Sequence, residues 1–480
     1  MDLRARLLVK YKNNIIDDLA NEKPAEEITV DALAKAEKVD PIKEPEKETT
    51  GESYLTEHEQ KFRTQVMMKV MEAIDLSKIG TLKDEEAKAQ IQEISKSVIE
   101  ELDIPLASNS RHKLVQIIED EILGLGPLEF LMRDLSISEI MVNGPKNVFV
   151  EQGGRLQKSP VTFDDNDHVM KVIDRIVSFV GRRIDESSPM ADARLADGSR
   201  VNIIIPPLAL DGATITIRRF PADPLTLDGL VGFNALSPGM AQFLKAIVKI
   251  GKNILISGGT GSGKTTALNA LSAYIPATER IVTIEDAAEL QLQQEHVVRL
   301  ETRPMNIEGN GEIAQRDLVK NALRMRPDRI VIGEVRGAEA MDMLQAMNTG
   351  HDGSLTTTHA NTPRDALSRI ENMVAMAGFE LPMKAVRAQI ASAIHYVIQV
   401  TRLEDGSRRM TAISEVNGME GDVVTMTDIF NFTRSGLDEN FKIQGAFTPS
   451  GALPSCIEEM SHKGLALDND FFDPDNKVEV

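Results

Sequence analysis

The sequence predicts an α/β fold in its second half, preceded by an α+β domain and a small helical bundle. From about residue 235, short continuous apolar runs alternate with helical patterns, as in parallel sheets that helices cover on both faces. Residues 125–225 contain short strand-like runs separated by Asn-Gly, Gly-Gly and Asp-Gly turns. Residues 53–107 carry apolar side chains at helical spacing, which predicts a bundle of short amphipathic helices.

These patterns divide the chain into five segments. The first 20 residues form either a frayed terminal helix or a helix that docks a partner, and the Glu-, Lys- and Pro-rich stretch after them predicts a disordered linker. A segment with two prolines, residues 221–232, predicts a hinge. The expected segments are 1–52 (helix and linker), 53–107 (helical bundle), 108–225 (α+β domain), 226–440 (α/β domain) and 441–480 (acidic C-terminal extension).

The composition argues against a nucleic-acid-binding protein. The net charge is −20, whereas a nucleic-acid motor usually needs a basic channel. Aromatic residues make up only 4% of the chain and Trp is absent, so stacking platforms for single-stranded nucleic acid are not expected. We therefore expect no nucleic-acid partner.

The chain has a single cysteine, Cys456, which excludes an internal disulfide and a zinc site built from cysteines. No apolar run approaches the roughly 18 residues of a membrane-spanning helix. The opening segment, MDLRARLLVKYKNN, lacks the apolar core and cleavage site of a signal peptide. We expect a cytoplasmic protein without direct membrane insertion, so any membrane connection would come through partners.

The strongest chemical motif is GGTGSGKT, which follows an apolar strand and opens a helix. In this context a glycine-rich loop wraps phosphates with its N–H groups, and an ordinary glycine-rich turn is the alternative. Lys264 is expected to reach the β- and γ-phosphates, and Thr265 to bind Mg²⁺. The expected nucleotide-binding residues are Gly258, Gly259, Thr260, Gly261, Ser262, Gly263, Lys264, Thr265 and Thr266.

Two more apolar strands end in acidic residues. Glu334 ends RIVIGE, where it could orient and polarise an attacking water molecule, or be a surface carboxylate. Glu285 and Asp286 end RIVTIED, where they could hold Mg²⁺ through water or place the nucleophile, or serve as a solvated residue and a helix cap. His359, in SLTTTHAN, could sense the γ-phosphate or be a structural histidine.

Four segments, GGTGSGKTT, TIEDAAEL, MRPDRIVIGEVRG and GHDGSLTTTHANTP, resemble in order the Walker A, Asp box, Walker B and His box of the secretion ATPase superfamily. Upstream, ILGLGPLEFLM, ISEIMVNGP, DARLADGSRVNIIIPP and ITIRRF resemble the amino-terminal domain of its CpaF-type members, which assemble Flp pili of the tight-adherence (Tad) system. The resemblance covers roughly residues 108–435. It implies a RecA-like P-loop ATPase domain and a hexameric ring with ATP held between the two domains.

The resemblance also implies roles for individual residues. It makes Glu334 the catalytic base, Glu285 an essential acidic residue, and His359 a phosphate or interface sensor. Arg200 and Arg218 match positions from which the amino-terminal domain offers arginines to the phosphates. A guanidinium stabilises well the charge that spreads over a transferring phosphoryl group. The alternative is that either arginine is a solvated residue at a strand edge.

For Arg218, the neighbouring Arg219 is a possible substitute. Beyond single residues, the resemblance implies a cytoplasmic motor that uses ATP and Mg²⁺ and powers assembly, with or without retraction, of a Flp or type IV-like pilus or of a related secretion machine. Its partners would be further copies of the chain and platform proteins of the inner membrane. A nucleic-acid translocase on the same core and an ATP-gated structural adaptor of a membrane platform are the alternatives. A tetracysteine zinc module and the motif of retraction ATPases are both absent, which favours the CpaF type.

Overall fold

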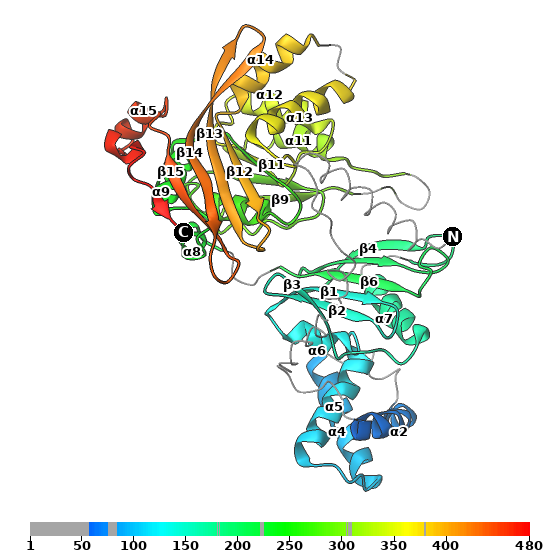
Figure 1. The fold of residues 1–480 in the computed structure, drawn as a ribbon. Helices are drawn as coiled ribbons and strands as arrows, with labels where there is room; N and C mark the ends of the chain where they lie inside the picture. Colours follow the sequence, from blue (N-terminus) through cyan, green and yellow to red (C-terminus); the bar gives the residue numbers. More distant parts are fainter. Residues whose placement is uncertain are drawn as a thin grey trace, which may run out of the picture.

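The structure, a computed structural model, describes residues 57–74, 84–179, 181, 183–220, 225–303, 305, 310–378 and 381–480. The helix and linker predicted over residues 1–52 lie outside these residues. Along its length the chain forms a helical bundle, a six-stranded sheet and a larger domain built on a ten-stranded sheet (Figure 1). Within the described residues, no helix combines the length and apolar character needed to cross a bilayer.

Three helices form the bundle, and each turns an apolar stripe toward the other two. Its core contains Val66, Ile91 and Leu114, all fully buried, one from each helix. Because α5 packs in this core, the bundle extends past residue 107 into the segment expected to open the α+β domain. The helices are α2 (Glu57–Ala73), α4 (Asp84–Glu101) and α5 (Ser108–Leu123), and the short α6 (Leu128–Arg133) leads into the next domain.

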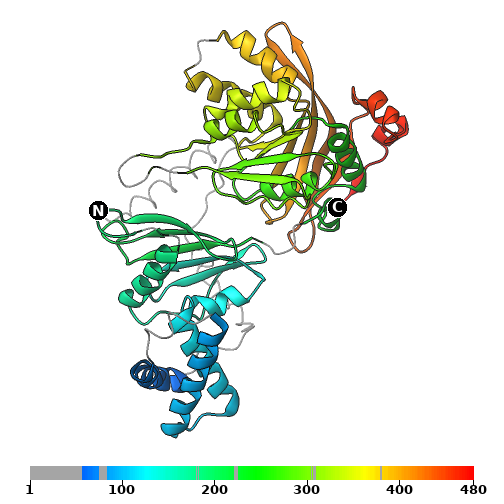
Figure 2. The same ribbon diagram turned by 180° about the vertical axis from the view of Figure 1, so that it is seen from behind.

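The six-stranded sheet is antiparallel throughout, with the order β3-β2-β1-β6-β5-β4. The helix α7 (Asn166–Phe179) covers one face with a buried stripe that includes Val169, Ile173 and Ile176. The opposite face points toward the larger domain (Figure 2). The strands are β1 (Ile137–Asn143), β2 (Val148–Gln152), β3 (Arg155–Lys158), β4 (Met190–Arg194), β5 (Arg200–Ile204) and β6 (Thr214–Arg218).

The larger domain is built on a sheet of order β16-β15-β14-β13-β12-β7-β11-β10-β8-β9. Its strands β12, β7, β11, β10, β8 and β9 run parallel, and their carboxyl ends therefore meet at one edge. The parallel strands are β7 (Ile254–Gly258), β8 (Ile281–Glu285), β9 (Val297–Glu301), β10 (Arg329–Ile332), β11 (Leu355–Thr358) and β12 (Tyr396–Arg402). The antiparallel strands are β13 (Arg408–Glu420), β14 (Val423–Leu437), β15 (Ile443–Pro449) and β16 (Val478–Glu479).

Helices cover both faces of this sheet, which explains the continuous apolar runs of its strands. In β7 the side chains of Ile254 and Ile256 enter one core and that of Leu255 enters the other. The first face carries α8 (Leu227–Gly232), α9 (Pro238–Ile250), α10 (Lys264–Ser272) and α15 (Ile457–His462). The second carries α11 (Gln315–Ala322), α12 (Glu339–Asn348), α13 (Pro363–Met376) and α14 (Met383–Ala393). The predicted α/β fold with a RecA-like domain, preceded by an α+β domain and a helical bundle, is confirmed.

Side-chain caps fix where the first two helices of the larger domain begin. The helix α8 occupies the second half of the predicted hinge, with the Thr226 side chain accepting a hydrogen bond from the Gly229 N–H at its start. The next helix, α9, begins after Ser237, which accepts from the Met240 N–H, and ends at Gly251 in the left-handed region with φ +90°.

Residues beyond the expected boundary at 441 extend the large sheet. The strand β15 pairs with β14 and buries Phe447 in the same core as Phe430. From the same region, Met460 and Phe472 also enter this core. The strands on the two sides of residue 441 pair with each other. The domain boundary expected there stays a prediction.

Candidate active site

The glycine-rich loop connects β7 to α10 at the carboxyl edge of the parallel strands. A Cβ on Gly258 would lie 2.3 Å from the carbonyl oxygen of Val400, so only glycine fits beside β12. Gly261 and Gly263 have φ values of +68° and +96°, which favour glycine. The sequence thus turns the backbone tightly just before a new helix, the arrangement in which N–H groups can converge on a phosphate.

Lys264 is buried at the start of α10, where its Nζ donates to the carbonyl oxygen of Gly259 at 3.1 Å. The N–H of Ser262 points to the same oxygen at 3.4 Å, so both donors face the inside of the loop. Burial lowers the pKa of Lys264, and the negative charge of Glu334 opposes this shift. A phosphate inside the loop would satisfy the same donors with a full negative charge.

Glu334 lies between two basic side chains, two residues beyond the end of β10. Its Oε2 accepts from Arg336 Nη2 at 2.6 Å, and its Oε1 lies 3.3 Å from His359 Nε2. The backbone here is fixed from two sides, because Gln315 donates to the Glu334 carbonyl oxygen at 3.0 Å and Thr357 Oγ1 donates to that of Gly333 at 2.7 Å. The carboxylate is therefore placed beside the lysine of the loop with both oxygens engaged.

His359 directly follows β11, the strand between β7 and β10. Burial lowers its pKa, as does the positive charge of Lys264, while Glu334 acts in the opposite direction. The imidazole is therefore neutral near pH 7 in this arrangement, and it can donate one hydrogen bond and accept another.

Glu285 ends β8 and is buried. Its Oε2 accepts from the N–H groups of Glu289 and Leu290, at 2.6 and 2.9 Å, whereas the buried Oε1 has no hydrogen-bond partner among the residues that the structure describes. Burial raises the pKa of Glu285 to about 7, against the two backbone hydrogen bonds. A Cβ on Gly333 would lie 3.0 Å from Cγ of Glu285, so the glycine before Glu334 leaves room for this carboxylate.

The chemistry of these oxygens fits Mg²⁺ delivered with a nucleotide. Among the described residues, no group of three or more His, Cys, Asp or Glu side chains is placed to hold a metal ion. Mg²⁺ is commonly bound by substrate phosphates, water and only one or two protein oxygens. Thr265 in the first turn of α10 and the unsatisfied Oε1 of Glu285 are the residues that would serve it here.

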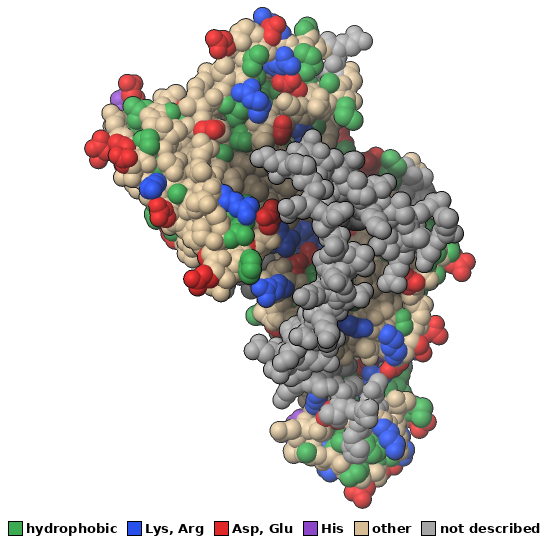
Figure 3. All heavy atoms as spheres, in the orientation of Figure 1, with side chains coloured by type: hydrophobic (Ala, Val, Ile, Leu, Met, Phe, Trp, Pro, Cys, Tyr) green, Lys and Arg blue, Asp and Glu red, His purple; other side chains and the backbone are tan. Residues whose placement is uncertain are grey.

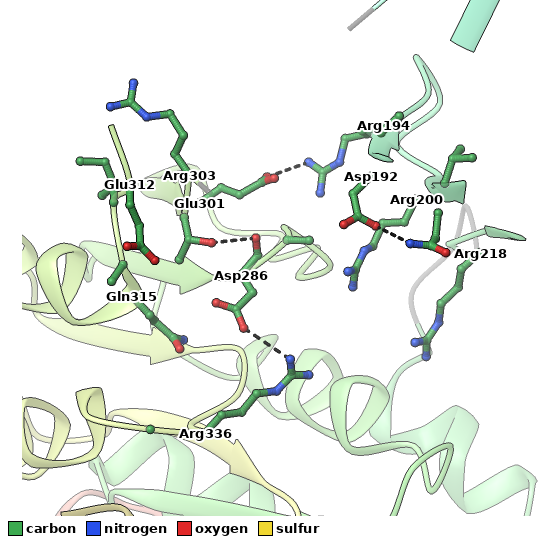
Figure 4. A pocket seen from close by; sticks show the side chains of 18 of the residues that line it. Asp192, Arg194, Arg200, Arg218, Asp286, Glu301, Arg303, Glu312, Gln315 and Arg336 are labelled. Carbon is green, nitrogen blue, oxygen red and sulfur yellow. Dashed lines mark hydrogen bonds and ion pairs between the residues drawn. The ribbon is translucent and has the colours of Figure 1, made fainter. Parts of the chain in front are cut away.

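A row of basic residues crosses the face of the six-stranded sheet that points toward these groups. Arg194, Arg200 and Arg218 lie directly opposite one another on β4, β5 and β6, and the acidic Glu139 lies next to Arg218 on β1. They line a cavity of about 1000 Å³ whose other wall includes Asp286, in ion-pair contact with Arg336 at 3.5 Å (Figure 4). The loop residues 258–265 do not line this cavity. The cavity reaches the candidate active site at Asp286 and Arg336 instead.

Two of these arginines contact the segment that follows β8. Arg200 Nη1 lies 2.7 Å from Oε1 of Glu289, the residue whose N–H is bonded to the Glu285 carboxylate. Arg194 Nη2 donates to the Ala288 carbonyl oxygen at 2.7 Å. The amino-terminal sheet is thereby connected to Glu285 through one short segment. Arg218, 3.7 Å from Glu139 in its own sheet, extends toward the larger domain.

Arg219 does not share this position. Its guanidinium donates to the carbonyl oxygens of Met132 at 2.8 Å and Ile137 at 3.3 Å, and also to that of Asp134. These bonds fix the start of β1, and Arg219 is not among the residues that line the cavity. The geometry therefore does not support Arg219 as a substitute for Arg218.

The structure adds residues that the sequence motifs did not single out. Arg336 contacts Glu334 and Asp286, and its place two residues after Glu334 in GEVRG was a usable signal. Glu289 lies in the segment TIEDAAEL, but nothing in that segment singled it out. Arg408 Nε donates to the Gly261 carbonyl oxygen at 2.9 Å from a hairpin 147 residues further along the chain, a proximity that only the fold reveals.

Taken with the parallel sheet, a glycine-rich loop between β7 and α10 and carboxylates after β8 and β10 define a RecA-like P-loop protein. Comparison with known families agrees: residues 121–439 match the family described as "Type II/IV secretion system protein". The chain belongs to this family.

Individual relatives share most of their length with this chain. A putative conjugal transfer protein of Mycobacterium tuberculosis is 37% identical over 319 residues, which cover 65% of this chain and 90% of the relative. The type IV secretion system protein VirB11 of Bartonella quintana is 33% identical over 331 residues, covering 60% and 91%. Among solved structures, the VirB11 ATPase of Brucella suis is 28% identical, with a TM-score of 0.33, and the match covers 60% of this chain and 95% of that one.

Proposed function

We propose that this chain hydrolyses ATP in the presence of Mg²⁺ and uses the energy for mechanical work. The observation that carries the proposal is the position of Glu334, which lies between Arg336 and His359 at the carboxyl edge that also holds Lys264. A base and a cation for the phosphates meet there, as hydrolysis of a phosphoanhydride uses, and a neutral imidazole lies beside them.

In the proposed reaction, the oxygen of a water molecule attacks the γ-phosphorus and the bond to the β–γ bridging oxygen breaks. Glu334 accepts the proton of that water. Arg336 and His359 each contact one oxygen of Glu334, and a carboxylate oxygen can accept a further hydrogen bond, so water can bind beside them. Arg336 is a cation and can move to the phosphates, where it stabilises charge. Mg²⁺ bound with the triphosphate would neutralise part of its charge.

We further propose that Arg200 and Arg218 couple hydrolysis to domain movement. The contact between Arg200 and Glu289 joins the two domains through the segment bonded to Glu285. A charged contact that depends on the bound phosphates gives ATP different affinities for two domain arrangements, which is the condition for a conformational change.

The machine that this motor serves is, in our proposal, a Flp or type IV-like pilus of the tight-adherence type or a related secretion system. Membership in the type II/IV secretion family supports this class. We propose a cytoplasmic homo-hexamer that associates with platform proteins of the inner membrane. Two relatives are named as conjugal transfer proteins, so a DNA-transfer machine is the second candidate.

A phosphate-release assay on the purified chain tests the enzymatic part of the proposal. We expect ATP turnover that requires Mg²⁺ and disappears in Lys264→Ala, and rings of six copies by mass photometry. Addition of DNA should leave the rate unchanged if the machine assembles pilin, and a strong stimulation would favour the second candidate. Turnover in Lys264→Ala equal to that of the wild type would contradict the P-loop assignment.

A further inference from the structure

The hairpin that joins β12 to β13 places two arginines against the P-loop. Arg408 Nε donates to the Gly261 carbonyl oxygen at 2.9 Å, and Cδ of Arg408 lies 3.5 Å from the position of a Cβ on Gly263. Arg402 Nη1 lies 3.6 Å from the position of a Cβ on Gly261. Its Nη2 donates to the carbonyl oxygen of Gly154, in the amino-terminal sheet, at 3.5 Å.

These two arginines are directly opposite each other on adjacent strands. Like charges in this position destabilise a sheet unless an anion neutralises them. Both residues are exposed, and no carboxylate of a described residue forms an ion pair with either of them. The chain as a whole has a net charge of −20. This pair of arginines beside a phosphate-binding loop is therefore a positively charged spot in an acidic protein.

The hairpin holds the arginines on a well-defined turn. Asp405 Oδ1 accepts from the N–H of Ser407 at 2.9 Å, and its Oδ2 accepts from the N–H of Ile443 at 3.0 Å. Leu403 and Ser407 close the turn by a backbone hydrogen bond of 2.8 Å. The tip is thus tied to β15, and the two guanidinium groups are presented from a rigid element rather than from a free loop.

The order of the sheet decides which part of a nucleotide faces this hairpin. On one side of β7 lie β11 and β10, which lead to His359 and Glu334, and on the other side lies β12. Val400 of β12 is paired with Gly258, the last residue of β7. Arg402 is two residues further along β12 and therefore lies beside the start of the P-loop. A nucleotide whose γ-phosphate is next to Glu334 therefore extends its nucleoside end toward the β12–β13 hairpin.

We propose that Arg402 and Arg408 form a subsite for the α-phosphate of the bound nucleotide and for the nucleoside attached to it. This inference rests on the proposed function and adds residues outside the four family motifs. A guanidinium suits this place because it binds phosphate oxygens through two N–H groups and stacks on the face of a base. Arg408 also fixes the Gly261 peptide, whereas Arg402 also contacts Gly154.

The test measures the affinity of the full chain for a fluorescent ADP analogue, a ligand that lacks the γ-phosphate. In Arg402→Ala and in Arg408→Ala we expect Kd to rise roughly tenfold, and in the matching Lys variants we expect part of the affinity to return. Arg434→Ala is the matched control, because Arg434 is exposed on β14 and pairs with Glu404. Its Kd should equal that of the wild type, and melting temperatures show whether each variant is folded.

Three outcomes would overturn the subsite. Unchanged Kd in both folded alanine variants would show that the hairpin does not contact the nucleotide. A loss in ATP turnover with full ADP affinity would place the arginines at the γ-phosphate. An effect of Arg402→Ala alone would assign the loss to the contact with Gly154. Failure of the wild-type chain to bind the analogue would instead contradict the proposed function itself, and the subsite with it.

Discussion

Arg200 and Arg218 lie directly opposite each other on β5 and β6, on the face of the sheet that points toward the larger domain. Such a pair weakens a sheet by repulsion, so its presence indicates an anionic partner. Arg200 has one in Glu289, 2.7 Å away, whereas Arg218, among the described residues, has only the longer contact with Glu139 at 3.7 Å. Basic side chains also gather on the surface where the two domains meet (Figure 3).

The first prediction concerns Arg218. Replacing it with Ala should lower kcat for ATP roughly 10²–10³-fold, the size of effect seen when one charge-stabilising donor is removed from a reacting centre. Affinity for ATP should fall less, and the melting temperature should barely change, since Arg218 is half exposed. Turnover assays and thermal melts of the same preparations provide the check.

Arg219→Ala is the matched control for this experiment. Its side chain holds three backbone carbonyl oxygens and does not line the cavity, so we expect a lower melting temperature with normal kcat per folded molecule. If Arg218→Ala behaved in the same way as Arg219→Ala, Arg218 would be a structural residue and the coupling proposal would lose its basis.

The second prediction is that Glu334→Gln binds ATP but hydrolyses it about 10²–10⁴-fold more slowly. The amide keeps the shape of the side chain but cannot accept a proton or pair with Arg336 as a charge. Single-turnover kinetics with bound ATP separate the chemical step from binding. Weak binding combined with normal single-turnover rates would contradict the role of Glu334 as base.

Periodicity was enough to predict the parallel core of this protein. The strands that end at Gly258 and Glu285 are continuous apolar runs because both of their faces are buried. The P-loop is a contiguous motif, and the acidic residues after two strands meet it because parallel strands share one edge. Glu285 and Glu334 are neighbours for that reason, across the pairing of β8 with β10.

Other features depended on contacts between distant segments. Arg402 and Arg408 approach the P-loop only because β12 returns to lie beside β7, and nothing in their local sequence signals this. Glu289 gains its importance from Arg200, which is 89 residues away. The domain boundary expected at 441 falls between β14 and β15, where alternating side chains on both strands continue one sheet. Pairing partners of antiparallel strands are not encoded in either strand alone.

The third prediction uses the buried position of Glu285. Its pKa is raised from 4.5 to about 7, so the folded state holds a proton that the unfolded chain releases between these values. Stability therefore falls as pH rises from about 4.5 to 7, by on the order of 3 kcal/mol in total. Glu285→Gln removes the ionisation, keeps an oxygen for the two backbone N–H groups, and should be more stable than the wild type at pH 8.

Thermal melts of both proteins at pH 5, 6, 7 and 8 test this prediction. We expect the melting temperature of Glu285→Gln to exceed that of the wild type by a margin that grows from pH 5 to 7 and then levels off. The variant should also lose ATP turnover. Glu439→Gln, which alters an exposed carboxylate, is the control and should show no such trend. An advantage that is the same at every pH would mean that desolvation of a charge is not its cause.

The fourth prediction concerns an ion-pair network between the helical bundle and the α+β domain. His168 of α7 contacts Glu121 of α5 at 2.9 Å and Asp164 at 3.5 Å, and Arg63 of α2 pairs with both of those carboxylates. Burial alone would lower the pKa of His168, but its bonds to Asp164 and Glu121 raise it to about 9. The hydrogen bond from His168 lowers the pKa of Asp164 to about 2, and Arg63 adds to this shift.

Because the folded-state pKa of His168 is raised from 6.5, its contribution to stability is complete below about pH 6.5 and is lost as pH rises through 9. Asp164 behaves in the opposite sense and loses its contribution only as pH falls toward 2. We therefore expect His168→Gln to melt below the wild type at pH 6, with a gap that shrinks between pH 7 and 10. His112→Gln, a change at an exposed position of α5, should show no gap at any pH. Since Gln can still form hydrogen bonds, a gap that persists unchanged at pH 10 would show that geometry, and not the positive charge of His168, holds the bundle to the sheet.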